Sequence, residues 1–160
     1  MLHALISPEG GIDRISANID PKARTRQGWR WVPVENVPAP DHASRLETVS
    51  SEYVVDGDKV VQRWTVARRD PVDQAQAVKR EARRRILARY EDWRQANMTA
   101  RGVELLSISM GRVWSREESD EAGALMAAWA WIKAVRSASD AIEAMAPIPA
   151  DFEADGYWPE

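Results

Sequence analysis

The sequence predicts an α+β fold, in which a small antiparallel β-sheet in residues 1–70 is followed by long helices in residues 71–160. Three observations support this division. Short β-branched runs separated by turn residues fill the first part of the chain. An apolar stripe at spacings of three and four residues begins at Val72. A capping box, the sequence Ser-Arg-Glu-Glu, opens a further helix at Ser115.

Two hairpins and one interrupted strand are expected in the first part. The segments "HALIS" and "IDRISAN" flank the turn sequence "PEGG" and predict a short hairpin. The next segment, "GWRWVPV", contains Pro33, which favours an edge strand or an extended segment because proline has no N–H for the ladder. The dipeptide Asp56-Gly57 lies between two β-branched runs and predicts the second hairpin.

Tryptophan occurs eight times, twice in the pattern Trp-x-Trp. In a strand, residues i and i+2 lie on one face, so Trp29 and Trp31 are expected to enter one core together. Alternation in the second hairpin places Val60, Trp64 and Val66 on one face. The sequence therefore predicts a small tryptophan-rich sheet.

The first long helix is expected to begin after Asp70, a good N-cap, with Pro71 at the first helical position. Lysine and arginine cover most of its polar surface over residues 79–89. Residues at helical spacing form one apolar stripe over six turns: Val72, Ala75, Val78, Ala82, Ile86, Tyr90 and Trp93.

A connector and a last helix follow. The helical pattern fades near Gly102, and "VELLSISMGRVW" predicts a short strand pair or an irregular connector. The last helix is expected to run from Ser115 to about Met145, because Pro147 and Pro149 stop it. An acidic tail completes the chain.

The second Trp-x-Trp lies in the last helix, where side chains two residues apart point about 200° apart. Trp129 and Trp131 therefore need two different surroundings. Residues 124–135 are apolar nearly all round, which is typical of a helix buried on several sides. Because one other long helix is expected, part of this surface is expected to be covered by a second chain.

Charge is distributed unevenly along the chain. Residues 1–70 have a net charge of 0, residues 71–114 of +4 and residues 115–160 of −7. The basic middle part and the acidic tail are expected to attract each other. Nucleic-acid phosphates are an alternative partner for the basic helix 79–89, but Glu81 lies within it and the whole chain is weakly acidic.

The sequence contains no motif for catalysis, a cofactor or a metal. His3 and His42 lie in segments without a partner pattern, and the absence of cysteine excludes disulfides and thiolate sites. The segment "DGD" lacks the rest of a calcium loop. A third hypothesis is a hydrolase with an acidic site near Asp151–Asp155, and no sequence motif supports it. We expect no enzyme activity, no cofactor, no signal peptide and no membrane span.

Partner contacts are instead expected on the apolar helix surface and in the tail, because tryptophan is enriched at interface hot spots. The candidate partner-binding residues are Trp131, Val135, Ile142, Tyr157 and Trp158.

Three segments carry a pattern of short motifs. The first is "GWRWVPVENVPAPD" followed by "YVVDGDKVVQRWTV", and the second is "MTARGVEL" followed by "VWSREESDEAGALMAAW". The third is the C-terminal segment, with Trp131, Arg136, Pro149, Trp158 and Pro159. Together they resemble small tail-fibre-associated and tail assembly proteins of tailed bacteriophages and prophages.

This resemblance implies a non-enzymatic tail-fibre or baseplate component that acts through protein–protein contacts in a homo- or hetero-oligomer. It equally implies a transient tail-fibre assembly chaperone that is not retained in the virion. The expected location is the virion tail, or the host cytoplasm during assembly. A nucleic-acid-binding regulator using the basic helix 79–89 is the alternative that the residues themselves leave open.

Overall fold

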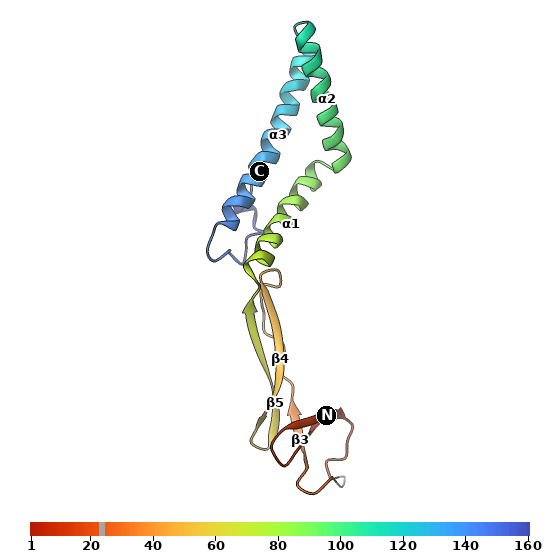
Figure 1. The fold of residues 1–160 in the computed structure, drawn as a ribbon, viewed down its shortest axis with the longest axis vertical. Helices are drawn as coiled ribbons and strands as arrows, with labels where there is room; N and C mark the ends of the chain where they lie inside the picture. The colour runs from red at the N-terminus through yellow and green to blue at the C-terminus, as the bar shows by residue number, and fades with distance from the viewer. Residues whose placement is uncertain (23–24) are drawn as a thin grey trace. The chain divides into compact units, whose positions relative to one another are not determined.

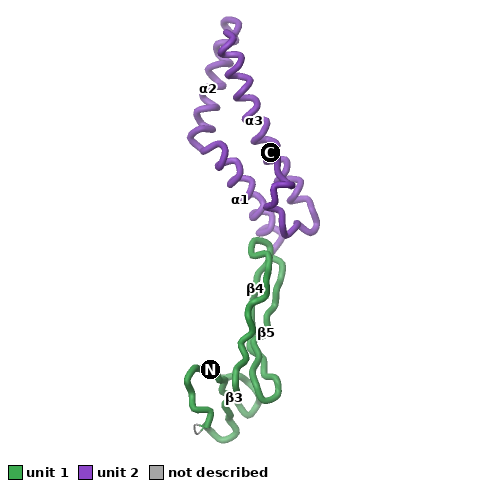
Figure 2. The backbone as a smooth tube through the Cα atoms, turned by 180° about the vertical axis from the view of Figure 1, so that it is seen from behind, with its two compact units in different colours: residues 1–69 green, residues 70–160 purple. Residues whose placement is uncertain are grey.

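The computed structural model describes residues 1–22 and 25–160, which form two compact units. The sheet unit, residues 1–69, contains five strands (Figure 1). The helical unit, residues 70–160, contains three α-helices and a short 3-10 helix, and Figure 2 colours the two units separately. The predicted α+β fold is confirmed.

The sheet unit is built from two hairpins and a strand between them. Strands β1 (Leu2–Ile6) and β2 (Ile12–Ala17) form the first hairpin, and β4 (Glu47–Asp56) and β5 (Lys59–Arg68) form the second. Strand β3 (Arg30–Glu35) pairs antiparallel with β1 and parallel with β5. The strand order is β2-β1-β3-β5-β4. Both predicted hairpins are therefore confirmed.

The second hairpin turns one residue later than predicted. Asp56 and Lys59 are the last cross-strand pair, which leaves Gly57 and Asp58 in the turn. Gly57 has a φ of +63°, a left-handed conformation that glycine adopts without a steric penalty. The "DGD" segment is thus a hairpin turn.

Strand β3 lies in the middle of the sheet, so the prediction of an edge strand from Pro33 is wrong. Its two halves pair with different neighbours. Residues 30–33 pair with β1, whereas Val34 and Glu35 pair with β5. The ladder to β5 begins just after Pro33, so the missing N–H removes no hydrogen bond on that side.

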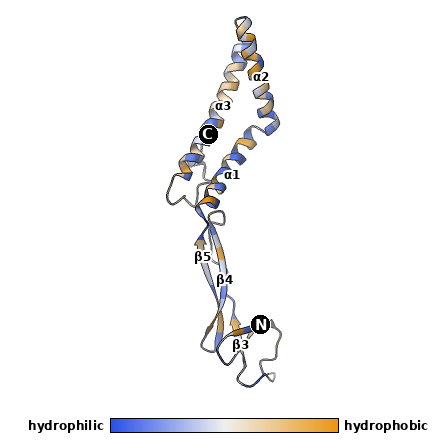
Figure 3. Cartoon of the chain, in the orientation of Figure 1, coloured by the Kyte–Doolittle hydropathy of each residue, from blue (hydrophilic) through white to orange (hydrophobic). Residues whose placement is uncertain are grey.

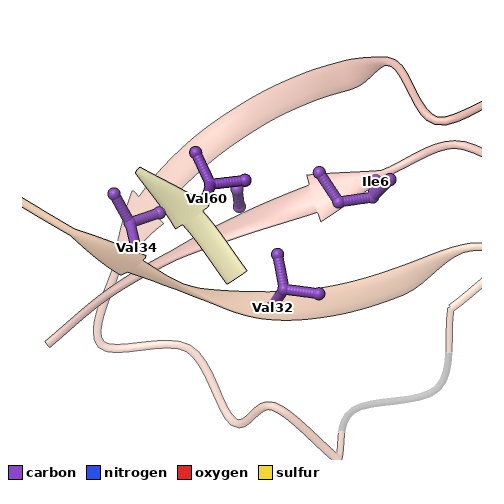
Figure 4. Packing of buried hydrophobic residues seen from close by; sticks show 5 residues of the cluster. Ile6, Val32, Val34 and Val60 are labelled. Carbon is purple, nitrogen blue, oxygen red and sulfur yellow. The ribbon is translucent and has the colours of Figure 1, made fainter. Parts of the chain in front are cut away.

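The core of the sheet unit is aliphatic, so the prediction of a tryptophan-rich core is wrong. Trp29, Trp31 and Trp64 are half-buried outside it, and Val66 is exposed. Trp31 follows the alternation of the strand and lies on the opposite face from its buried neighbours. Figure 4 shows part of the buried cluster, which consists of Ala4, Ile6, Val32, Val34 and Val60.

The helical unit consists of α1 (Pro71–Arg89), α2 (Asp92–Gly111) and α3 (Arg116–Glu143). Helix α1 lies beside the C-terminal half of α3, and α2 lies beside its N-terminal half (Figure 1). The Asp70 carboxylate accepts a hydrogen bond of 2.8 Å from the Val72 N–H, which confirms the predicted N-cap.

Helix α2 corrects the prediction for "VELLSISMGRVW". The segment is helical up to Gly111, and the helix passes through Gly102. A mid-helix glycine costs about 1 kcal/mol relative to alanine, which packing against α3 offsets. The chain breaks instead at Tyr90 and Glu91, between α1 and α2.

The predicted apolar stripe on α1 is wrong at its two ends. Val72 is 67% exposed in the first turn, and Trp93 is 63% exposed because it belongs to α2, beyond the break. The buried residues of α1 are Gln74, Ala77, Val78, Glu81, Ala82 and Ile86.

Candidate functional site

The C-terminal segment, residues 144–160, packs against α1 and α3. Phe152 and Trp158 are 1% and 6% exposed, and the Trp158 indole N–H donates a hydrogen bond of 2.7 Å to the Phe152 carbonyl. The Arg85 guanidinium lies 5.2 Å from the centre of the Trp158 ring. Trp158 is therefore enclosed by its own chain, and its prediction as a partner contact is wrong.

Arg85 joins the basic helix to the acidic segment. Its guanidinium lies 2.8 Å from the buried Glu81 carboxylate and 2.9 Å from the Asp155 carboxylate, and it donates a hydrogen bond of 2.6 Å to the Glu153 carbonyl. Arg84 also binds Glu81, at 2.6 Å. These contacts confirm the expected attraction between the basic middle part and the acidic tail.

Trp131 of α3 contacts the last residue of the C-terminal segment. Its indole N–H donates a hydrogen bond of 2.8 Å to the Glu160 carbonyl. The Arg89 guanidinium lies 4.6 Å from the ring centre, and Tyr90 approaches the ring edge-on at 5.8 Å. Trp131 is half-buried, so the chain itself occupies much of the surface that was expected to meet a partner.

The other predicted partner-binding residues have mixed outcomes. Val135 and Ile142 are 0% and 1% exposed, so neither is available to a partner, and that part of the prediction is wrong. Both lie on the side of α3 that is covered within the helical unit. Tyr157 is half-buried and donates a hydrogen bond of 3.3 Å to the Asp151 carboxylate.

An apolar groove lies between α2 and α3, and several of its lining side chains are exposed. The groove has a volume of about 380 Å³ and its lining is largely apolar. Val103, Leu106 and Met126 line it and are 64%, 59% and 63% exposed. Figure 3 shows hydrophobic residues recurring along α2, which faces this groove.

The two tryptophans of α3 have the different surroundings that their spacing predicts. Trp129 lines the groove toward α2, whereas Trp131 contacts Tyr90 and Arg89 at the end of α1. Gly102 lines the groove opposite α3, and a side chain there would meet open space. The missing side chain at Gly102 helps to keep the groove hollow.

Ion pairs connect α2 to α3 next to the residues that line the groove. Arg101 of α2 binds both oxygens of Glu121 of α3, at 2.9 and 2.8 Å, and also binds Glu104 at 2.8 Å. Residues 101–126, which include parts of both helices, contain three arginines and five carboxylates, a net charge of −2. The groove is therefore apolar inside, and the segments that form it are weakly acidic.

The capping box at the start of α3 predicts a pH response. The Arg112 guanidinium, at 2.6 Å, and then the Ser115 N–H, at 2.8 Å, lower the pKa of Glu118 to about 2. A carboxylate with a lowered pKa stabilises the folded state above its ordinary pKa of 4.5. We expect this contribution to disappear as the pH falls from 4.5 toward 2.

Carboxyl NMR titration of the full chain checks this expectation, with a midpoint near 2 for Glu118. In a Glu118→Gln variant the difference in helical-unit stability from the wild type should shrink as the pH falls through this range. A Glu118 midpoint near its ordinary value of 4.5 would contradict the capping geometry.

A second hollow, of about 510 Å³, lies between α1, the start of α2 and the C-terminal half of α3. Two ion pairs lie among its lining residues: Lys79 with Glu143 at 3.4 Å, and Arg83 with Asp92 at 3.7 Å. The buried Ser139 hydroxyl donates a hydrogen bond of 3.0 Å to Glu143. The described lining residues include three basic and three acidic side chains, so their net charge favours neither an anionic nor a cationic ligand.

Comparisons with protein-family models, curated proteins and solved structures find no match to the chain. Within residues 1–22 and 25–160, no helix is long and apolar enough to cross a bilayer. The same part of the chain holds no group of three or more histidine, aspartate and glutamate side chains placed to bind a metal ion.

Proposed function

We propose that the chain is a non-enzymatic protein-binding component of a bacteriophage tail, and that the groove between α2 and α3 receives a helix of its partner. The proposal depends on one observation, namely that Val103, Leu106 and Met126 are exposed around an apolar groove. A groove between two helices accepts the apolar face of a third, with anchors at helical spacing. The weakly acidic segments that form the groove favour an amphipathic partner helix that carries lysine or arginine.

The resemblance of three segments to tail-fibre-associated proteins supports a tail fibre or baseplate subunit as the partner. A virion component and a transient assembly chaperone would use the same groove, and they differ in whether the chain stays in the particle. Mass spectrometry of purified virions distinguishes them, because a structural component is present at a fixed ratio to its partner.

Internal ion pairs count against the nucleic-acid alternative. Within helix 79–89, Arg84 and Arg85 bind Glu81, and Lys79 binds Glu143. Phosphate contacts by these side chains would require the internal pairs to open. Binding to DNA that falls steeply with salt concentration would support the alternative in spite of these pairs.

A double substitution in the groove tests the proposal. We expect Val103→Ser with Leu106→Ser to weaken binding of the partner about 30-fold, the effect of losing about 2 kcal/mol at a hot spot. Both side chains are exposed, so the helical unit should keep its stability. The measurement is titration calorimetry with co-expressed tail-fibre and baseplate proteins of the same phage or prophage.

Val72→Ser is the matched control. Val72 is 67% exposed on α1, outside the groove, and its replacement should leave the affinity unchanged. Equal binding by the control and the groove variant would show that the partner docks elsewhere.

A further inference from the structure

The sheet unit carries a polar pocket on the face of β1, β2 and β3 that lies away from its core. Leu5 of β1 pairs with Arg14 of β2 on one side and with Trp31 of β3 on the other. These three side chains therefore form a row across three strands. The pocket above them has a volume of about 340 Å³, and Trp29 and Arg26 also line it.

A β-bulge places an acid in the same pocket. Leu5 pairs with Arg14 and Ile6 pairs with Ile12, which leaves Asp13 as an extra residue in β2. A bulge redirects a side chain that would otherwise lie on the opposite face. Asp13 and Arg14 both line the pocket as a result, and their side chains lie 3.6 Å apart.

Hydrogen bonds link residues 25–29, the segment that carries Trp29. The Thr25 hydroxyl donates to the Trp29 carbonyl at 2.6 Å, and the Trp29 N–H donates to the Arg26 carbonyl at 3.0 Å. Gly28 has a φ of +82°, and a side chain there would approach the Pro8 ring to 2.9 Å. The wall of the pocket is thus preformed, which lowers the cost of binding.

These groups match the chemistry of an acidic sugar, and we propose that this pocket binds a saccharide that carries a carboxylate. The C–H faces of a sugar ring pack on the apolar bodies of Trp29 and Trp31. Arg14 and Arg26 present planar forks that suit a carboxylate, and Asp13 accepts hydrogen bonds from hydroxyl groups. Among the described lining residues, two arginines beside one aspartate favour an anionic ligand over a neutral one.

Single-stranded nucleic acid is the competing ligand, because bases also stack on indoles beside arginine. The pocket has room for a small group rather than a chain of nucleotides. The sugar is therefore the ligand that all the lining groups accommodate.

The test uses the full chain labelled with ¹⁵N and four probes: N-acetylneuraminic acid, a glucuronic-acid disaccharide, the matched neutral glucose disaccharide and a short oligothymidylate. We expect the Trp29 and Trp31 indole signals to shift with at least one acidic sugar at about 10 mM or below, and the neutral sugar to bind about tenfold more weakly. No shift with either acidic sugar, equal binding of the neutral sugar, or preference for the oligonucleotide would overturn the proposal.

Two variants assign the binding to the pocket. Arg14→Gln, at a largely exposed side chain, and Trp31→Ala should each reduce acidic-sugar affinity at least tenfold. Arg63→Gln, at an exposed arginine of β5 outside the pocket, is the control and should bind like the wild type. Wild-type affinity in Arg14→Gln would place the ligand elsewhere and refute the assignment.

Discussion

Replacing Trp158 with alanine is expected to destabilise the helical unit by about 3–5 kcal/mol. The indole is 6% exposed, its N–H is bonded to the Phe152 carbonyl, and Arg85 lies over its ring. Truncation leaves a cavity and removes the partner of a buried carbonyl group. The loss should therefore appear as lower stability of the isolated chain rather than as weaker binding to a partner.

Urea unfolding of the full chain, followed by circular dichroism at helix wavelengths, measures this change in the free energy of unfolding. Trp93→Ala is the control, because Trp93 is 63% exposed and its loss should cost under about 1 kcal/mol. A Trp158→Ala chain as stable as the wild type, with weaker partner binding, would instead restore Trp158 as an interface residue.

Replacing Glu81 with alanine should have a similar effect, about 3–5 kcal/mol, because it removes one partner of a buried ion pair. The Glu81 side chain is fully buried, and that of Arg85 is 16% exposed. Without Glu81 the Arg85 guanidinium keeps its contacts to the C-terminal segment but loses the carboxylate beneath it. We expect α1 and the C-terminal segment to separate more easily as a result.

The same pair makes stability depend on pH in the wild type. Arg84, and then Arg85, lower the pKa of Glu81 below its ordinary value of 4.5. Its ionised form stabilises the fold above that pH, and the contribution is lost as the pH falls through the lowered pKa. Protonation at low pH should therefore weaken the same contact that the alanine substitution removes.

Urea midpoints of the Glu81→Ala, Glu81→Gln and Glu104→Ala chains check this prediction at neutral pH. Glu81→Gln keeps the shape but not the charge, so it should lose most of the same stability. Glu104 is an exposed partner of Arg101, and its removal should cost at most about 1 kcal/mol. Equal midpoints for Glu81→Ala and Glu104→Ala would mean that the buried pair contributes nothing to the fold.

Local signals in the sequence predicted the elements whose stability is local. The hairpin around Gly57, the Asp70 N-cap and the Ser115–Glu118 capping box all form, since each depends on residues within a few positions. The attraction between the basic helix and the acidic segment was also predictable, because net charge is visible in the sequence.

Elements that depend on distant partners were predicted wrongly. Helix α2 contains Gly102 and the segment Ser107–Ser109, and its packing on α3 overrides that weak local preference. Pro33 suits a central strand because β3 changes neighbours just after it. Neither fact can be read from residues nearby in the chain.

The two candidate binding surfaces were missed for related reasons. The apolar groove requires α2 to be a helix, and the sequence predicted a strand pair or a connector there. Trp29 and Trp31 line the same pocket, as their spacing predicts, but this pocket lies on the face of the sheet away from the core. The spacing of i and i+2 says that two side chains share a face, and it does not say which face is buried.

The bond between Arg85 and the Glu153 carbonyl joins residues 68 positions apart. During synthesis at roughly 5–20 residues per second, Glu153 is added about 3–14 seconds after Arg85. Until Glu153 is added, Arg85 on the newly made α1 lacks its contact with the C-terminal segment. The helical unit must therefore finish folding late in translation, and a ribosome that stalls before Glu153 would leave it incomplete.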